Sequence, residues 1–347
     1  NYFYVGNGSG GDVSAPYSIN LVQGLVNAGV QLDSTVLAAY ESWCTASVND
    51  PDPGFWGHWP RYYAEMPVKQ DWVQAAAKRC QTAVVVIGRS AGEDRENTLK
   101  KGSFYLTNKE KALLDAVTAA FQKVVLVLNI GSIMDFAEID AYGDKISAIL
   151  LAWQLGMESG NAVADVLTGQ VNPSGRLTDT IAKTYADYPA QNFGNKAENH
   201  YTEDIFVGYR YFETFAPERV LYPFGYGLSY TDFACKMKKT EIKDQTVTVQ
   251  VQVENTGALP GKQVVQLYAC CPCGALGKAA KVLIAFGKTE ELAPGKHQTL
   301  TLTAPYRHFA SFDDSGAAGH KNAWLLEAGD YTFCLGTDVR SAVPCGD

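Results

Sequence analysis

The first part of the chain alternates between two hydrophobic patterns. Short runs of consecutive apolar residues, many of them β-branched, occupy 83–87, 124–129 and 148–153. Segments whose apolar positions recur every three or four residues occupy 71–80, 107–121 and 159–167. The first pattern is typical of parallel strands buried on both faces, and the second of amphipathic helices. We therefore expect βαβ units on a mostly parallel sheet.

Local signals support two of these expected helices. Thr107 and Glu110 have the spacing of a capping box, in which each residue satisfies a free backbone N–H at the start of the helix. Gly169, followed by the turn signal Asn172-Pro173, is expected to end the last helix.

After about residue 235 the hydrophobic period changes to two. Residues 246–253 alternate apolar and polar side chains, and Asn255-Thr256-Gly257 is a turn signal. Further strands are expected at 264–268 and 300–303, with a last strand opening at Gly329. Short strands separated by turns predict a β-sandwich of about 110 residues.

The polar, irregular texture of 184–203 suggests a linker between these two regions or a loop laid over the surface. We expect an α/β domain over 1–190, a linker and junction over 191–235, and the β-sandwich over 236–347. Nothing in the chain suggests an internal repeat.

Charge and hydropathy narrow the classes of partner. The formal net charge of −8 argues against a nucleic acid as the main partner. Since no run of about 18 apolar residues occurs, no membrane-spanning helix is expected.

The chain begins Asn1-Tyr2-Phe3, without an initiator Met or a signal-peptide pattern. We expect this start to be an interior point of a longer polypeptide or a processed end.

The cysteines do not predict a metal site. Of eight cysteines, only Cys270, Cys271 and Cys273 cluster. A zinc site needs about four ligands in paired spacing, and no second Cys or His pair lies nearby. We therefore expect reduced thiols packed among strands, no metal and no cofactor.

The strongest candidate for chemistry follows the apolar run that ends at Ile87. Ligands collect at the carboxyl ends of strands in open α/β sheets, and the connection from there to the helix near Thr107 is unusually long. It carries several acids, among them Glu93, together with several bases. From the pattern alone, a solvated charged loop and a catalytic carboxylate both remain open.

Several motifs carry a resemblance to a known family. Gly88-Arg89-Ser90-Ala91-Gly92-Glu93-Asp94-Arg95, with Gly102 to Leu106, resembles the acid/base loop of glycoside hydrolase family 3. Other segments in family order are 8–13, 129–132, 156–175, 205–211 and 223–230. Together they span nearly the whole chain, which makes the resemblance specific.

The resemblance implies a three-layer α/β sandwich followed by a fibronectin III-like domain. It also implies that Glu93 is the general acid/base of a retaining enzyme. The nucleophile in this family is an Asp on a (β/α)8 barrel, a pattern that this sequence does not contain. Asp94 stands where the family commonly has Gly, which puts the local backbone beside Glu93 in doubt.

The resemblance further suggests residues that contact the substrate. We expect Arg89 and Asp94 to do so from the loop, and Trp56 from the aromatic segment 55–63. Aromatic faces suit sugar rings because they bury apolar C–H surface. The alternative for Trp56 is a loop packed on the domain surface.

The expected function is therefore part of an exo-acting β-glucosidase, with a β-glucoside or oligosaccharide as substrate. Its expected partner is the barrel domain of the same enzyme, and a homo-oligomer is possible. Two alternatives stay open. One is a non-catalytic carbohydrate-binding or scaffold protein, and the other is a β-xylosidase of the same family.

Overall fold

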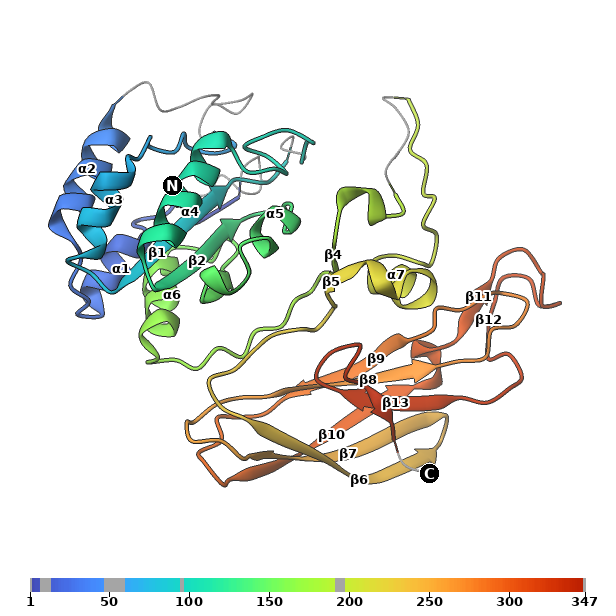
Figure 1. Ribbon diagram of the computed structural model, residues 1–347. Helices are drawn as coiled ribbons and strands as arrows, with labels where there is room; N and C mark the ends of the chain where they lie inside the picture. Colours follow the sequence, from blue (N-terminus) through green and yellow to red (C-terminus); the bar gives the residue numbers. More distant parts are fainter. Residues whose placement is uncertain (1, 7–13, 47–59, 94–96, 191–196, 346–347) are drawn as a thin grey trace. The chain divides into compact units, whose positions relative to one another are not determined.

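The structure is a computed structural model that describes residues 2–6, 14–46, 60–93, 97–190 and 197–345. The chain forms two compact units, Asn1–Val171 and Asn172–Asp347, and each is described by itself (Figure 1). Among the described helices, none is long and apolar enough to cross a lipid bilayer. The domain ranges expected from the sequence stay a prediction.

A parallel sheet is the centre of the first unit. Its strands, in spatial order, are β1 (Thr82–Arg89), β2 (Lys123–Ile130) and β3 (Ala148–Leu151). The three apolar runs form strands of one parallel sheet, as the sequence predicts. β2 is buried along most of its length, but β3 is not, because Ala148 and Ile149 are exposed and Leu150 and Leu151 are half-buried. Gly88 pairs in register with Asn129, so β1 and β2 end at the same edge of the sheet.

Helices cover both faces of this sheet. They are α1 (Leu21–Asn27), α2 (Ser34–Thr45), α3 (Gln70–Ala77), α4 (Asn108–Ala120), α5 (Ala137–Asp140) and α6 (Ser159–Thr168). Helices α1 and α6 pack with Val127 and Ala152 on one face. Because side chains alternate along a strand, the fully buried Leu126 and Leu128 point to the other face, where α4 contacts β1 and α3 packs on α4 (Figure 1). The expected α/β architecture is confirmed, with three layers.

Local sequence signals explain several of these elements. The capping box forms as expected: the Thr107 hydroxyl accepts from the Glu110 amide, and the Glu110 carboxylate accepts from the Thr107 amide. Gly169 ends α6 in the left-handed conformation that favours glycine, with φ of 77°. Glycine also permits the close crossing of α1 and α6, because a Cβ on Gly24 would lie 2.0 Å from the carbonyl oxygen of Gly160.

The second unit contains two antiparallel sheets. One has the order β10-β7-β6 and the other β14-β13-β8-β9. Their strands are β6 (Phe233–Lys243), β7 (Thr246–Asn255), β8 (Val264–Cys270), β9 (Val282–Lys288), β10 (His297–Pro305), β13 (Thr332–Gly336) and β14 (Val343–Pro344). Alternate residues of β7, from Val247 to Val253, are fully buried in the core that the two sheets share. The expected antiparallel β region is confirmed.

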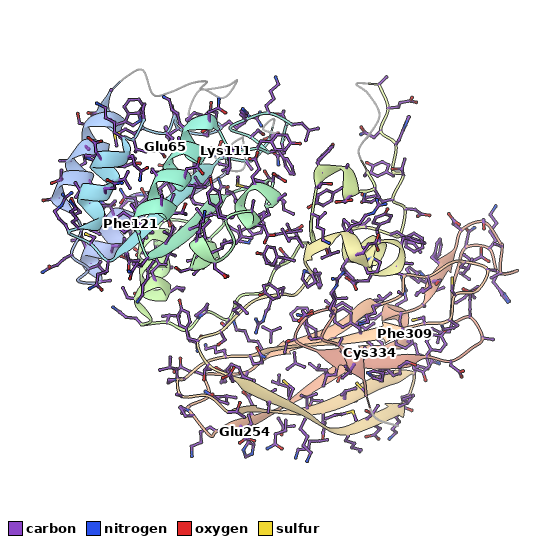
Figure 2. The ribbon with its side chains drawn as sticks, viewed as in Figure 1. Glu65, Lys111, Phe121, Glu254, Phe309 and Cys334 are labelled. Atoms are coloured by element: carbon purple, nitrogen blue, oxygen red, sulfur yellow. The ribbon has the colours of Figure 1, made fainter. Side chains whose placement is uncertain are left out.

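Smaller elements complete this unit. They are β4 (Ile181–Ala182), α7 (Tyr209–Phe215), β5 (Val220–Tyr222), β11 (Ser311–Asp313) and β12 (Ala323–Leu325). Helix α7 packs through Tyr209, whose ring stacks on Phe224 and meets the edge of Tyr268. Phe309 and Cys334, both labelled in Figure 2, are buried in this unit.

One expectation for this unit needs correction, and one strand was not predicted. The strand expected to open at Gly329 begins at Thr332, and it is not the last, because the short β14 follows it. The sequence analysis did not predict strand β6 as an element. Most of its side chains are exposed and several are Lys, so it shows no hydrophobic pattern.

Candidate functional site

The candidate site is the connection from β1 to α4, residues 90–107, which lies at the carboxyl edge of the parallel sheet. Glu93 lies in its described part and is exposed. Ligands in open α/β sheets bind outside the carboxyl ends of strands, so this edge is where a reacting group is expected. Asp94 and Trp56, the other two expected contacts beside Arg89, lie outside the described residues.

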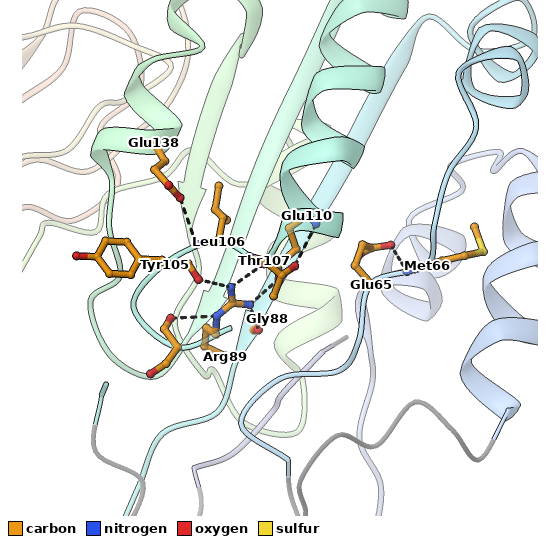
Figure 3. Close-up of polar contacts among 10 residues, drawn as sticks. Glu65, Met66, Gly88, Arg89, Tyr105, Leu106, Thr107, Glu110 and Glu138 are labelled. Carbon is orange, nitrogen blue, oxygen red and sulfur yellow. Dashed lines mark hydrogen bonds and ion pairs between the residues drawn. The ribbon is translucent and has the colours of Figure 1, made fainter. Parts of the chain in front are cut away.

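Arg89, the last residue of β1, is buried with 3% of its surface exposed. Its guanidinium donates to both carboxylate oxygens of Glu110, at 2.7 and 2.8 Å (Figure 3). It also donates to the carbonyl oxygens of Gly88, Ser103 and Tyr105. All five N–H donors of a guanidinium are thereby used. The contacts favour a structural role for Arg89 over the substrate contact that the sequence suggested.

The part of the loop that leads into α4, residues 97–107, is called the returning arm here. Hydrogen bonds of Ser103 hold it together. The Ser103 hydroxyl donates to the side-chain oxygen of Asn97 at 2.8 Å and accepts from the amide of Thr98 at 2.9 Å. Next to it, Gly102 has φ of 84°, and a Cβ there would lie 2.2 Å from the ring of Tyr62. Glycine is therefore required at this position by both conformation and space.

The part of the loop that leaves β1, residues 90–93, is the outgoing arm. It is also held by hydrogen bonds, through Ser90. The Ser90 hydroxyl donates to the carbonyl of Pro60 at 2.7 Å, and its amide donates to the carbonyl of Arg61 at 2.8 Å. Ala91 lies against the exit of β2, because a Cβ on Gly131 would stand 2.6 Å from the Cβ of Ala91. Glu93 therefore lies two residues beyond an anchored stretch of backbone.

The described end of the aromatic segment packs against the protein. The Tyr62 ring lies under the Arg89 guanidinium at 5.5 Å, and the Tyr63 ring stacks on Phe3 at 5.2 Å. These contacts agree with the packing interpretation for Tyr62 and Tyr63. They do not bear on Trp56.

Asn129 joins three segments at this edge and is fully buried. Its side-chain oxygen accepts from the Phe3 amide at 2.5 Å, while its amide donates to the carbonyls of Phe3 at 2.8 Å and Trp153 at 2.6 Å. The sequence analysis singled out 129–132 only as one of the segments in family order. The partners lie 126 and 24 positions away, so a local pattern could not reveal them.

Two further acids near this unit's core were missed by the sequence analysis. Glu65 is buried, and its carboxylate accepts from the Tyr40 hydroxyl at 2.7 Å. It also accepts from the Met66 amide at 2.8 Å (Figure 3). Asp135 is also buried. Burial raises the pKa of both carboxyl groups, because the charged form loses its hydration. Isolated acids without a motif give no sequence signal of burial.

Comparison with known proteins decides the family. The profile described as "Glycosyl hydrolase family 3 C-terminal domain" matches residues 1–230, and that of a "Fibronectin type III-like domain" matches residues 263–339. The chain belongs to glycoside hydrolase family 3. The resemblance drawn from the motifs is therefore confirmed.

Relatives of this family 3 chain include enzymes named as β-glucosidases. The β-glucosidase of Ruminococcus albus is 46% identical over 99% of this chain and 36% of the relative. Beta-glucosidase A of Butyrivibrio fibrisolvens is 39% identical over 96% of this chain and 45% of the relative. The chain thus spans less than half the length of these relatives.

Solved structures of family 3 enzymes share the fold. A β-glucosidase from Paenibacillus barengoltzii superposes with a TM-score of 0.95 at 44% identity, covering 100% of this chain and 38% of the other. β-Glucosidase 3B from Thermotoga neapolitana, solved in complex with glucose, gives a TM-score of 0.86 at 34% identity, covering 98% and 47%. Among the described residues of our family 3 chain, no sheet closes into a barrel.

Proposed function

We propose that this chain supplies Glu93 as the general acid/base of a retaining, exo-acting β-glucosidase. The nucleophile would be an Asp from a barrel domain outside this chain. One observation carries the proposal: Glu93 is exposed at the carboxyl edge of the sheet, on a loop whose two arms are anchored. The resemblance of the loop to the family's acid/base motif, the membership of the chain in the family and the names of the relatives support it.

Glycoside cleavage needs a group in this situation. The acid protonates the leaving oxygen while the nucleophile attacks the anomeric carbon from the opposite side, and the same group then deprotonates the incoming water. The two carboxyl groups of a retaining enzyme lie about 5–5.5 Å apart across the sugar. Asp94 is bonded directly to Glu93, so it cannot readily reach the opposite face of the sugar. A nucleophile from another domain meets this requirement.

The role of Glu93 is tested by Glu93→Ala in the complete enzyme, barrel included. A positioned acid/base contributes about 10²–10⁴-fold to the rate. We expect a loss of that size in kcat/KM for cellobiose, whose leaving group needs a proton, and a much smaller loss in kcat/KM for a dinitrophenyl glucoside, whose leaving group does not.

Glu158→Ala is the matched control, because Glu158 is an exposed acid of the same unit at the start of α6. This variant should hydrolyse both substrates with the kcat/KM of the wild type. Cellobiose hydrolysis near the wild-type rate by Glu93→Ala would show that the assignment is wrong.

The preference for glucose is a separate proposal. It follows the relatives named above, but another, the exo-α-(1→6)-L-arabinopyranosidase of Bifidobacterium breve, is 31% identical over 79% of this chain. A pentosidase is therefore the second candidate. The kcat/KM values for nitrophenyl β-glucoside, β-xyloside and α-L-arabinopyranoside, measured on the complete enzyme, decide between them.

A further inference from the structure

A buried ion pair joins the two ends of the loop that carries Glu93. Arg89 ends β1 on the outgoing side, and Glu110 stands in the first turn of α4 on the returning side. Their side chains are only 3% and 2% exposed. Both carboxylate oxygens take part, so the contact has the two-pronged geometry that fixes orientation as well as distance.

Each partner also holds backbone of the returning arm. The Nε of Arg89 donates to the Ser103 carbonyl at 3.1 Å, and its Nη2 lies 3.5 Å from the Tyr105 carbonyl oxygen. The Glu110 carboxylate accepts from the Thr107 amide at 2.7 Å. One salt bridge therefore connects the end of β1, three points of the returning arm and the start of α4 (Figure 3).

Stability alone does not explain an ion pair at this place. Two charges taken out of water lose about as much hydration energy as they regain from each other, and well-packed apolar side chains often serve as well. What apolar side chains cannot supply is a donor to the carbonyls of Ser103 and Tyr105. The distinctive contribution of the pair is therefore to the geometry of the loop.

We propose that Arg89 and Glu110 are a positioning pair that places the Glu93 carboxyl for proton transfer. This inference rests on the proposed role of Glu93. Neither residue of the pair touches the substrate. A misplacement of about 1 Å in a reacting group can lower a rate by about 10²-fold, so loosening the base of the loop should be seen in catalysis.

The test uses the double variant Arg89→Met/Glu110→Leu in the complete enzyme. It removes both charges together and so leaves no unpaired buried ion. We expect a lower Tm, because the Ser103 and Tyr105 carbonyls and the Thr107 amide lose their partners. In the folded enzyme we expect a loss of about 10-fold or more in kcat/KM for cellobiose, with little loss in kcat/KM for a dinitrophenyl glucoside. A merely structural pair would lower both activities together, in proportion to the folded enzyme.

A second variant covers the case in which the double variant does not fold. Arg89→Lys keeps the charge opposite Glu110 but loses the fork that reaches Ser103 and Tyr105. We expect it to show the same split between the two substrates, and a shift in the alkaline limb of the kcat/KM profile for cellobiose. Glu110→Gln is less informative, because it leaves the buried guanidinium of Arg89 without a charged partner.

The outcomes separate this inference from the proposed function. If Glu93→Ala shows the split between substrates while the folded Arg89 and Glu110 variants behave as wild type, or lose both activities equally, the positioning role is overturned. If Glu93→Ala shows no split, the proposed function itself has failed. A split in the pair variants, in addition to that in Glu93→Ala, supports both.

Discussion

Asn129 offers the sharpest test of how the sheet edge is held together. Replacing it with Leu, which has a similar branched shape, removes three hydrogen bonds to the backbone of Phe3 and Trp153. Leaving three buried groups unpaired would cost at least about 3 kcal/mol, at about 1–3 kcal/mol each.

The protein has an alternative to leaving all three groups unpaired. It can release the segment around Phe3, whose side chain is 1% exposed, and so let water reach its amide and carbonyl. That route costs about 2 kcal/mol in lost apolar burial. The Trp153 carbonyl still loses its donor, at about 1 kcal/mol or more. Both routes lead to a loss of about 3 kcal/mol, a large share of the roughly 5–15 kcal/mol that stabilises a domain.

The assay is urea unfolding of Asn129→Leu, with hydrogen exchange at Phe3 to identify the route. Asn108→Ala is the control, because Asn108 is exposed and its loss should change the free energy of unfolding by less than about 0.5 kcal/mol. An Asn129→Leu midpoint equal to that of the wild type would refute the argument. It would show that the backbone groups find other partners at no cost.

Two other predictions concern the same unit. Gly24→Ala should separate α1 from α6, because the added Cβ would lie 2.0 Å from the Gly160 carbonyl oxygen. Thermal unfolding should show a lower Tm. An unchanged Tm would mean that the two helices can move apart without loss of stability. Burial raises the pKa of Glu65 above its unfolded value of about 4.3, so its ionisation opposes folding as pH rises from that value through the folded pKa. Glu65→Gln keeps an acceptor for Tyr40 and should remove this part of the pH dependence of urea unfolding; an identical pH dependence in the variant would contradict it.

Local patterns were enough to predict the three parallel strands and helices α3, α4 and α6, but not α1, α2 or α5. The apolar runs around Val85 and Leu126 are buried strands, and the spacing of Thr107 and Glu110 gives the capping box because both signals act within a few residues. Strand β6 escaped prediction because its exposed Lys and Thr side chains carry no hydrophobic alternation.

The candidate site was predicted less completely, and the reason is the separation of its parts along the chain. A motif was enough to single out Glu93. The role of Arg89 depends on a carboxylate 21 positions away, and that of Asn129 on a backbone 126 positions away. The family resemblance suggested that Arg89 contacts a substrate, but only the tertiary structure shows that its donors are used within the protein.

Azide rescue of Glu93→Ala tests the central claim most directly. Azide attacks the glycosyl-enzyme without needing a general base, so it can replace the water that the variant no longer activates. With a dinitrophenyl glucoside and the complete enzyme, we expect turnover to rise with azide concentration and β-glucosyl azide to form, while Glu158→Ala and the wild type form none. A Glu93→Ala enzyme that ignores azide, or that hydrolyses cellobiose at the wild-type rate, would contradict the assignment of Glu93 as acid/base.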